Sequence, residues 1–526
     1  MSQHSLPLPG LLMVVLWTVG LGSLYVGAQD LSDLPGPGGT LLIRDIATGR
    51  FSLGFSSRLG ALLLPFVGSP VWVARVLSIG ATVAAAVGAT LLGTAVAGRT
   101  AGTWAGLLTA AWAPAAYIGW SLGPGTIAWG VTWLGLGLCA WACRQQRLVW
   151  VLVGATVALC GTAVKSTALP ALVLLPLMPL WAATGWRGRV RMSAIVAVGA
   201  GLGIWIGLLG ATTGEPFLLA PDSPSLARIL PAAHGFSALE GIEGVFSIVR
   251  RGHPHGSFGV AVGLAIIGVL VPGDHRLVRT GILLLTLAAM AIVGLVTGPL
   301  LVPRYLVPAS LGLVVLSGIA LRSWPRDLVP RNIWRGLAGI VLLVVTMDGI
   351  AFASAWSRVR QTYIAIEGHR FPPVPAPFAA RYTRLGRGIV KASSQPGILG
   401  LMKWIRAQPG EPFASTPFRD RRESHAHLAA IASGSPFSVL RQGSCCSDSP
   451  DIESCAFDLV RTIQDGGVRL MMPDGLEGTS PDEQRFAEAL GRAAGELQLQ
   501  HHPIDGFSIW VGQGSGGADL CRPGQW

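Results

Sequence analysis

Three carboxylates lie early in the chain, in a segment (residues 29–70) between two apolar runs. Asp30, Asp33 and Asp45 could each accept a proton from an attacking group or stabilise developing charge, which are the two tasks of a carboxylate in group transfer. Structural roles are also open, because Asp30 could simply end the preceding helix and Asp45 could face water. The segment is therefore a candidate site of general-base chemistry.

Positively charged residues between later apolar runs could bind phosphate oxygens. They are Lys165 at the end of the fifth run, the pair Arg250 and Arg251, and Arg304, which Tyr305 follows. The planar guanidinium of arginine can bind phosphate in a bidentate manner. Lys165 could equally anchor the end of a membrane helix, and an interfacial Tyr is ordinary. An arginine on the outer face opposes the usual charge bias, which favours a functional role for Arg304.

Two histidines and one further carboxylate complete the candidates. His253 and His255 follow the arginine pair, where loop polarity or phosphate contact is favoured over metal binding. Asp348 lies inside the last apolar run. An ionisable group within a membrane span is a functional candidate by default, although a hydrogen-bonded structural role is equally open. The sequence leaves the use of a metal unknown.

The composition excludes an ordinary soluble protein. The chain is 51% hydrophobic and only 13% charged, about half of the charge usual in globular proteins. Its net charge of +12 comes almost entirely from arginine in short clusters, without the basic, aromatic-rich tract that would indicate a nucleic-acid partner. We therefore expect an integral membrane protein that binds no nucleic acid.

The positioning elements are apolar runs long enough to cross a bilayer, which needs about 20 residues of helix. We expect about eleven such helices. They start near Leu11, Val71, Trp104, Thr126, Leu148, Ala168, Met192, Phe258, Thr280, Leu306 and Gly336.

Arginines in alternate connections predict the orientation of these helices. Every second connection is arginine-rich, as expected of cytoplasmic loops. The arginines concerned are Arg99, Arg144, Arg147, Arg187, Arg189, Arg191, Arg276, Arg279, Arg322, Arg326, Arg331 and Arg335. The pattern predicts a cytoplasmic N-terminus and an extracytoplasmic C-terminal part at the inner (plasma) membrane. The first run could also be a cleaved signal, but the absence of Lys and Arg before it favours a retained helix.

The sequence predicts three parts. Residues 1–355 form an all-α polytopic membrane domain, in which a short amphipathic helix at about 40–49 lies on the outer membrane surface. Residues 356–396 are a proline-rich linker, and residues 397–526 alternate helical and extended stretches, as in a small α/β domain. Four cysteines fall in the last part (445, 446, 455 and 521), where a structural disulfide is favoured over metal binding. Cys139, Cys143 and Cys160 are interpreted as small apolar residues.

An ordered set of motifs resembles a known family. A first helix, an outer loop with an early Asp and a surface helix are followed by four segments: 69–78 (SPVWVARVLS), 97–102 (AGRTAG), 164–169 (VKSTAL) and 303–308 (PRYLVP). This order and spacing resembles the C-type membrane glycosyltransferases, which include bacterial protein O-mannosyltransferase, aminoarabinose transferase and lipopolysaccharide-core sugar transferase relatives. The resemblance covers roughly residues 10 to 355.

The resemblance implies transfer of a sugar from a polyprenyl-phosphate donor to a glycan, lipid or protein acceptor at the outer face of the membrane. It assigns Asp33 as the catalytic base, or as a partner of a divalent metal. The sequence departs from the family at Leu34 and at Gly125, which occupy positions where relatives often have a second acid. These departures motivate an alternative: a noncatalytic membrane protein that binds lipid-linked sugar or assists an assembly complex.

Overall fold

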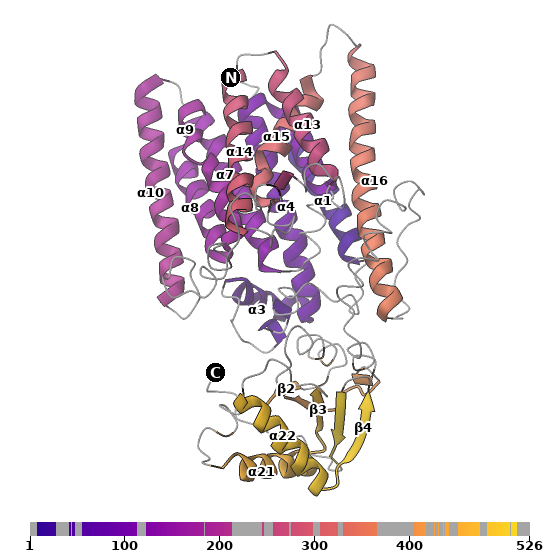
Figure 1. The fold of residues 1–526 in the computed structure, drawn as a ribbon. Coiled ribbons are helices and arrows are strands. Elements are labelled where there is room, and N and C mark those ends of the chain that lie inside the picture. Colours follow the sequence, from indigo (N-terminus) through magenta and orange to yellow (C-terminus); the bar gives the residue numbers. More distant parts are fainter. Residues whose placement is uncertain are drawn as a thin grey trace. The chain divides into compact units, whose positions relative to one another are not determined.

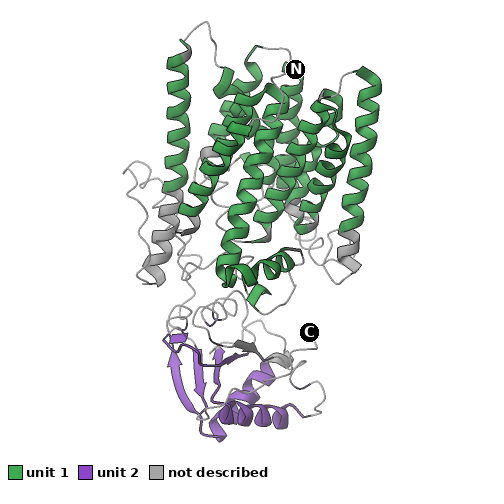
Figure 2. Ribbon diagram, turned by 180° about the vertical axis from the view of Figure 1, so that it is seen from behind, with its two compact units in different colours: residues 1–361, 367–388 green, residues 362–366, 389–526 purple. Residues whose placement is uncertain are grey.

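The computed structural model describes the chain in two compact units (Figure 2). Unit 1 comprises residues 1–361 and 367–388, and unit 2 comprises residues 362–366 and 389–526. The described residues are 8–27, 42–43, 45–47, 55–112, 123–182, 185–212, 243, 245–246, 256–272, 275–297, 306–323, 330–364, 401, 404–405, 407–416, 426, 430, 435, 437–440, 446, 451–473, 481–504 and 507–512.

Unit 1 is helical, and a helix lies at each of the eleven apolar runs (Figure 1). Its elements are α1 (Leu8–Gly27), α3 (Phe55–Val67), α4 (Pro70–Ala97), α5 (Arg99–Ala111), α7 (Pro124–Gln145), α8 (Leu148–Val164), η2 (Ser166–Leu174), α9 (Leu177–Ala182), α10 (Gly185–Thr212), α13 (Gly256–Leu270), α14 (Arg276–Thr297), η6 (Pro308–Ser310), α15 (Leu311–Ser323) and α16 (Arg331–Ile364). Residues 42, 43 and 45–47 are also helical, which agrees with the short helix expected at about 40–49.

The apolar helices identify a multi-pass membrane protein. Five of the described helices are long and apolar enough to span a bilayer, and six further apolar helices have 10 to 17 residues. The count of about eleven spans therefore stays a prediction. Large hydrophobic side chains are exposed on the outer surface of unit 1, as on Leu277 and Ile340. In water these side chains would destabilise the fold, whereas in lipid they are at no disadvantage.

Glycines allow the central helices to pack closely. A Cβ atom at Gly88 of α4 would lie 2.2 Å from the carbonyl oxygen of Trp133 in α7, and one at Gly135 would lie 2.2 Å from the backbone nitrogen of Ala158 in α8. No larger residue fits such contacts without moving the backbone. Small residues at helix contacts are the usual way in which membrane helices approach one another. They hold α4, α7 and α8 together as one packed layer.

The sixth run differs from the continuous helix that its length suggests. Residues Ser166–Leu174 form a 3₁₀ helix (η2), and the α-helix resumes only at Leu177. Pro170 lies inside η2, and proline lacks the N–H that an α-helix needs. The break leaves Lys165 in an extended conformation between α8 and η2.

Unit 2 contains a five-stranded sheet with the order β2-β1-β3-β5-β4 (Figure 1). The strands are β1 (Phe413–Ser415), β2 (Phe437–Val439), β3 (Arg469–Pro473), β4 (Gln500–Ile504) and β5 (Phe507–Val511). The first three pair in parallel, and β5 pairs antiparallel with β3 and β4. Helices α21 (Ile452–Asp465) and α22 (Pro481–Glu496) pack against the sheet through a core that includes Val460, Leu470 and Phe486. The predicted α/β character of this part is confirmed.

A disulfide joins Cys446 to Cys455, with Cα atoms 6.0 Å apart. The expected structural disulfide is therefore present, while Cys445 and Cys521 lie outside the described residues. Cys139, Cys143 and Cys160 are free thiols in the helices of unit 1.

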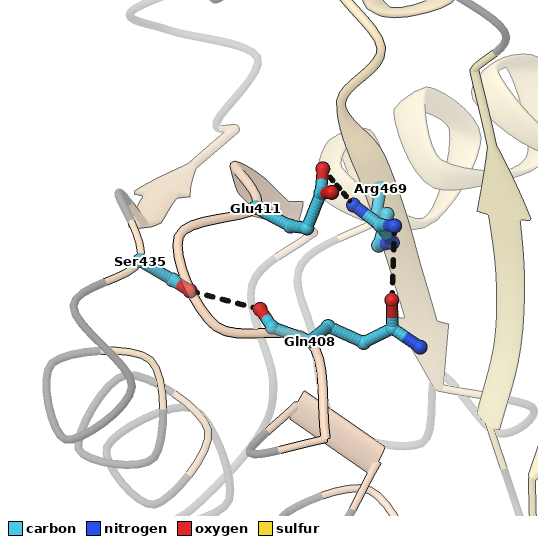
Figure 3. Close-up of polar contacts among 4 residues, drawn as sticks. All are labelled: Gln408, Glu411, Ser435 and Arg469. Atoms are coloured by element: carbon cyan, nitrogen blue, oxygen red, sulfur yellow. Dashed lines mark hydrogen bonds and ion pairs between the residues drawn. The ribbon is translucent and has the colours of Figure 1, made fainter.

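A polar cluster in unit 2 joins the start of β1 to the start of β3 (Figure 3). The Arg469 guanidinium forms an ion pair with Glu411 and donates a hydrogen bond to the Gln408 side chain, and the Ser435 hydroxyl donates to the Gln408 carbonyl. The cluster lies at the amino ends of parallel strands, whereas ligands bind such sheets at the carboxyl ends. We therefore assign it to stability.

Candidate functional site

Lys165 and Gly125 come together from two different helices. Lys165 follows the last residue of α8, and Gly125 is the second residue of α7. A Cβ atom built on Gly125 would lie 3.8 Å from the Nζ atom of Lys165 and 3.7 Å from its Cδ atom. The lysine side chain therefore lies beside the first turn of α7, at a position where Gly125 has no side chain.

The first turn of α7 carries partial positive charge. Gly123 caps the helix without a side-chain hydrogen bond, and Pro124 occupies the first helical position. Pro124 has no N–H, and the Thr126 amide donates to the Gly123 carbonyl oxygen, so it is the helix dipole that makes this end attractive to anions. The Lys165 ammonium beside this end adds a full positive charge to the partial charge of the helix. The arrangement is therefore suited to binding a phosphate group.

A third segment is held against α7 by a buried tryptophan. The Trp133 indole Nε1 of α7 donates a 2.8 Å hydrogen bond to the Pro308 carbonyl oxygen of η6. Both Leu306 and Val307 are fully buried next to it. The chain enters this segment directly from Arg304 and Tyr305. The segment that follows these two residues in the sequence is thus held against α7.

Asp45 is fully buried, so the interpretation that it faces water is wrong. Its Oδ2 atom accepts a 2.7 Å hydrogen bond from the Ser57 hydroxyl of α3. The neighbouring Ile46 side chain fills the space next to Gly60, where a Cβ atom would lie 2.5 Å from it. Asp45 is therefore held in place by α3, and its environment is that of a positioned, desolvated carboxylate.

Arg75 is a buried cation that the sequence reasoning missed. It lies in the second turn of α4, is 7% exposed, and its guanidinium stacks 4.7 Å from the centre of the Trp72 ring. The available signal was an arginine inside an apolar run, since buried charge in a membrane helix is costly and is usually functional. Arg75 belongs to the first of the four motif segments (69–78), but the sequence did not indicate that its side chain is buried.

The other predicted site residues lie outside the described part of the structure, and their roles stay predictions. They are Asp30, Asp33, Arg250, Arg251, His253, His255, Arg304 and Tyr305. Within the described residues, no group of three or more His, Cys, Asp or Glu side chains could hold a metal ion. Metal use therefore stays untested.

Known proteins share this fold at low sequence identity. No protein-family model matches the chain, and neither does any curated protein. The crystal structure of ArnT from Cupriavidus metallidurans bound to undecaprenyl phosphate matches with a TM-score of 0.54 at 14% identity, covering 98% of this chain and 99% of that one. The apo state of the same protein matches with a TM-score of 0.50, at the same identity and coverage. The chain therefore shares the fold of these ArnT structures, which agrees with the resemblance of its ordered motifs to the C-type membrane glycosyltransferases.

Proposed function

We propose that the chain transfers a sugar from a polyprenyl-phosphate donor to an acceptor hydroxyl or amine at the outer face of the membrane. The observation that carries this proposal is the Lys165 ammonium beside the first turn of α7, which suits the phosphate of such a donor. The shared fold supports the same reaction, because the matching ArnT structure was solved with undecaprenyl phosphate bound.

The proposed reaction is a single displacement. The acceptor attacks the anomeric carbon of the donor while Asp33 takes the acceptor proton. The bond between the anomeric carbon and the phosphate oxygen breaks, and the electron pair leaves with the polyprenyl phosphate. Lys165 and Arg304 stabilise the negative charge on this leaving group. Attack opposite the leaving group inverts the configuration of the sugar carbon.

The proposed topology places this site outside the cytoplasm. The arginine-rich connections argue for a cytoplasmic N-terminus, and the Cys446–Cys455 disulfide supports an oxidising compartment for unit 2. A donor presented on the outer face of the inner membrane would meet Lys165 there. The acceptor class is left open among glycan, lipid and protein.

A transfer assay with labelled polyprenyl-phosphate sugars in membranes that contain the full chain tests the proposal. The Asp33→Asn variant preserves the size of the side chain and removes the base, so transfer should fall by about 10²-fold or more. Wild-type transfer by Asp33→Asn would remove Asp33 from the mechanism.

A noncatalytic role in binding lipid-linked sugar is the second candidate. Gly125 favours it, because a side chain there is absent and no acid faces Lys165 from this position. Tight binding of the donor by the purified chain without turnover would support this candidate. Sustained turnover by the same preparation would exclude it.

A further inference from the structure

Five arginines lie at the end of the helix bundle where α8 and α10 begin, and the proposed reaction uses none of them. This basic cluster has one residue in the last turn of α7, one that directly precedes α8 and three in the first two turns of α10: Arg144, Arg147, Arg187, Arg189 and Arg191. The 17 residues of α8 separate it from Lys165, which is about 25 Å of helix. The basic cluster is therefore distinct from the candidate site.

Close packing of α8 against α10 holds the cluster together (Figure 1). A Cβ atom at Gly199 of α10 would lie 2.8 Å from the Cβ atom of Ala155 in α8, and one turn later Gly203 meets Leu159 in the same way. The Thr156 hydroxyl of α8 also donates a 3.0 Å hydrogen bond to the Gly199 carbonyl oxygen. Both pairs of contacts advance by four residues on each helix, so the two helices run parallel.

This register brings charges of one sign to one level. Arg191 and Arg147 each precede the first of these contacts by eight residues, so they lie at about the same height. Arg187 lies one turn before Arg191 on the same side of α10, where like charges repel. Residues 46–214 contain no Asp or Glu, so no acidic side chain of the helices from α3 to α10 can neutralise the cluster.

Hydrogen-bond donors without acceptors lie at the same end of the bundle. The guanidinium carbon of Arg147 is 5.6 Å from the centre of the Trp141 ring in α7, and Trp141 is only 6% exposed. In the described structure, the buried indole N–H groups of Trp141 and of Trp181 in α9, which leads into α10, have no hydrogen-bond partner. Buried donors are normally satisfied by protein, water or a bound group. Arginine and tryptophan side chains only donate, so this end of the bundle lacks acceptors, which a phosphate supplies.

Apolar side chains are exposed on the same two helices next to the cluster. They are Val149 and Trp150 of α8 and Trp186 and Val190 of α10, and Trp186 is 76% exposed. Tryptophan beside charged residues is typical of the boundary between lipid and water. Charge and apolar surface together match a molecule with an anionic head group and hydrocarbon chains.

We propose that the basic cluster binds an anionic glycerophospholipid of the bilayer, with its phosphate among Arg147, Arg187 and Arg191 and its acyl chains along the exposed sides of α8 and α10. The predicted topology assigns this lipid to the cytoplasmic leaflet. A zwitterionic lipid has the same phosphate but also carries a cation that the arginines repel, so head-group charge distinguishes the two lipids. The proposal does not depend on sugar transfer.

The test uses the purified full chain in vesicles of phosphatidylglycerol and phosphatidylethanolamine, in equal amounts and with identical acyl chains. Native mass spectrometry then measures which lipid stays bound. We expect the wild type to retain the glycerol lipid about tenfold more than the ethanolamine lipid, the equivalent of one charge-assisted hydrogen bond. The double variant Arg187→Gln with Arg191→Gln should lose this preference. Arg187→Lys with Arg191→Lys should keep most of it, because the charge is retained.

Arg276→Gln with Arg335→Gln is the matched control. These two arginines are exposed near the starts of α14 and α16, belong to the same predicted cytoplasmic set, and their loss removes the same charge. This variant should keep the wild-type preference. Equal retention of the two lipids by the wild type would overturn the proposal. An unchanged preference in the glutamine variant of α10 would also overturn it, and so would an equal loss in the control, which would indicate a general effect of surface charge.

Should the glutamine variant of α10 fail to fold, the salt dependence of the wild type replaces it. Salt screens exposed charges, so the preference for the glycerol lipid should fall as the salt concentration rises. A preference that high salt leaves unchanged would overturn the proposal.

Discussion

The ammonium nitrogen of Lys165 lies 3.8 Å from the point that a Cβ atom would take at Gly125. This is an ordinary van der Waals separation, so a small side chain fits at position 125 and its polar end would meet the lysine. A charged side chain at position 125 would therefore change the net charge next to Lys165 while the lysine itself stays in place.

Gly125→Asp should weaken binding of polyprenyl phosphate, because the new carboxylate pairs with Lys165 and repels the phosphate. We expect a loss of at least about tenfold in affinity, comparable to one charge-assisted hydrogen bond. Titration of the reconstituted chain with a fluorescent polyprenyl phosphate measures this affinity.

Gly125→Asn and Gly125→Ala are the controls for this variant. Asparagine has the shape of aspartate without its charge, and alanine adds only the Cβ atom that the site accommodates. Both should lose far less affinity than Gly125→Asp. An equal loss of affinity in Gly125→Asp and Gly125→Asn would show that the size of the side chain, and not its charge, matters at this position.

Lys165 itself could be predicted as a site residue from the sequence, but its neighbour could not. The residue type of Lys165 and its place at the end of an apolar run were enough to select it. Its partner was not predictable, because Lys165 and the first turn of α7 are 40 positions apart and meet only when α7 and α8 pack. For Asp45, the short amphipathic helix could be predicted from the sequence. The burial of its carboxylate and the hydrogen bond from Ser57 of α3 could not, because they depend on the packing of another helix.

Two tryptophans one helical turn apart in α7 allow a controlled test of the hydrogen bond that holds η6 against α7. Trp129 and Trp133 are both fully buried and pack edge to face at 5.3 Å. Only Trp133 donates a hydrogen bond, to Pro308, whereas the Trp129 indole has no partner among the described residues. Trp133→Phe should therefore cost about 1 kcal/mol of stability and weaken donor binding, because it frees the segment that follows Arg304.

Trp129→Phe should leave donor binding close to wild type. Both variants lose a similar volume, so a thermal-shift measurement in detergent separates the hydrogen bond from the packing. The same loss of donor affinity in both variants would contradict this role for the Trp133–Pro308 bond.

The buried Asp45 predicts different effects for two neighbouring serines. Ser57→Ala removes the hydroxyl that donates to the Asp45 carboxylate, and we expect a loss of about 1.5 to 3 kcal/mol. Ser56→Ala should be nearly neutral, because its buried hydroxyl has no partner in the described structure. Denaturation monitored by thermal shift compares them. A larger effect of Ser56→Ala than of Ser57→Ala would refute the assignment.

The disulfide of unit 2 predicts the compartment of the C-terminal part. Alkaline phosphatase fused after Trp526 should be active, because this reporter needs an oxidising compartment for its own disulfides. In the same cells, Cys446 and Cys455 should resist thiol-reactive labels until they are reduced. A well-expressed but inactive fusion would reverse the topology and place Lys165 on the cytoplasmic side.

One strand of unit 2, β4, was not predicted from the sequence, and the reason is local. β4 (Gln500–Ile504) has the sequence QHHPI, which lacks the alternating apolar residues of a strand and contains a proline. It is an edge strand, where proline is tolerated and where pairing with β5 decides the conformation. The helices of unit 2 were predictable because their apolar periodicity is strong, and α21 has an Asp451 N-cap that accepts from the Glu453 and Ser454 amides.

The most direct test of the central claim is turnover by the purified chain. Vesicles that contain wild type or Lys165→Gln receive a polyprenyl-phosphate sugar labelled in the sugar, together with a membrane extract as the source of acceptor. We expect the wild type to move the label from the lipid to an acceptor and Lys165→Gln to do so about 10²-fold more slowly, the usual cost of losing one group that stabilises charge in the transition state. Equal rates for the two proteins, or no transfer of label by the wild type, would contradict the account.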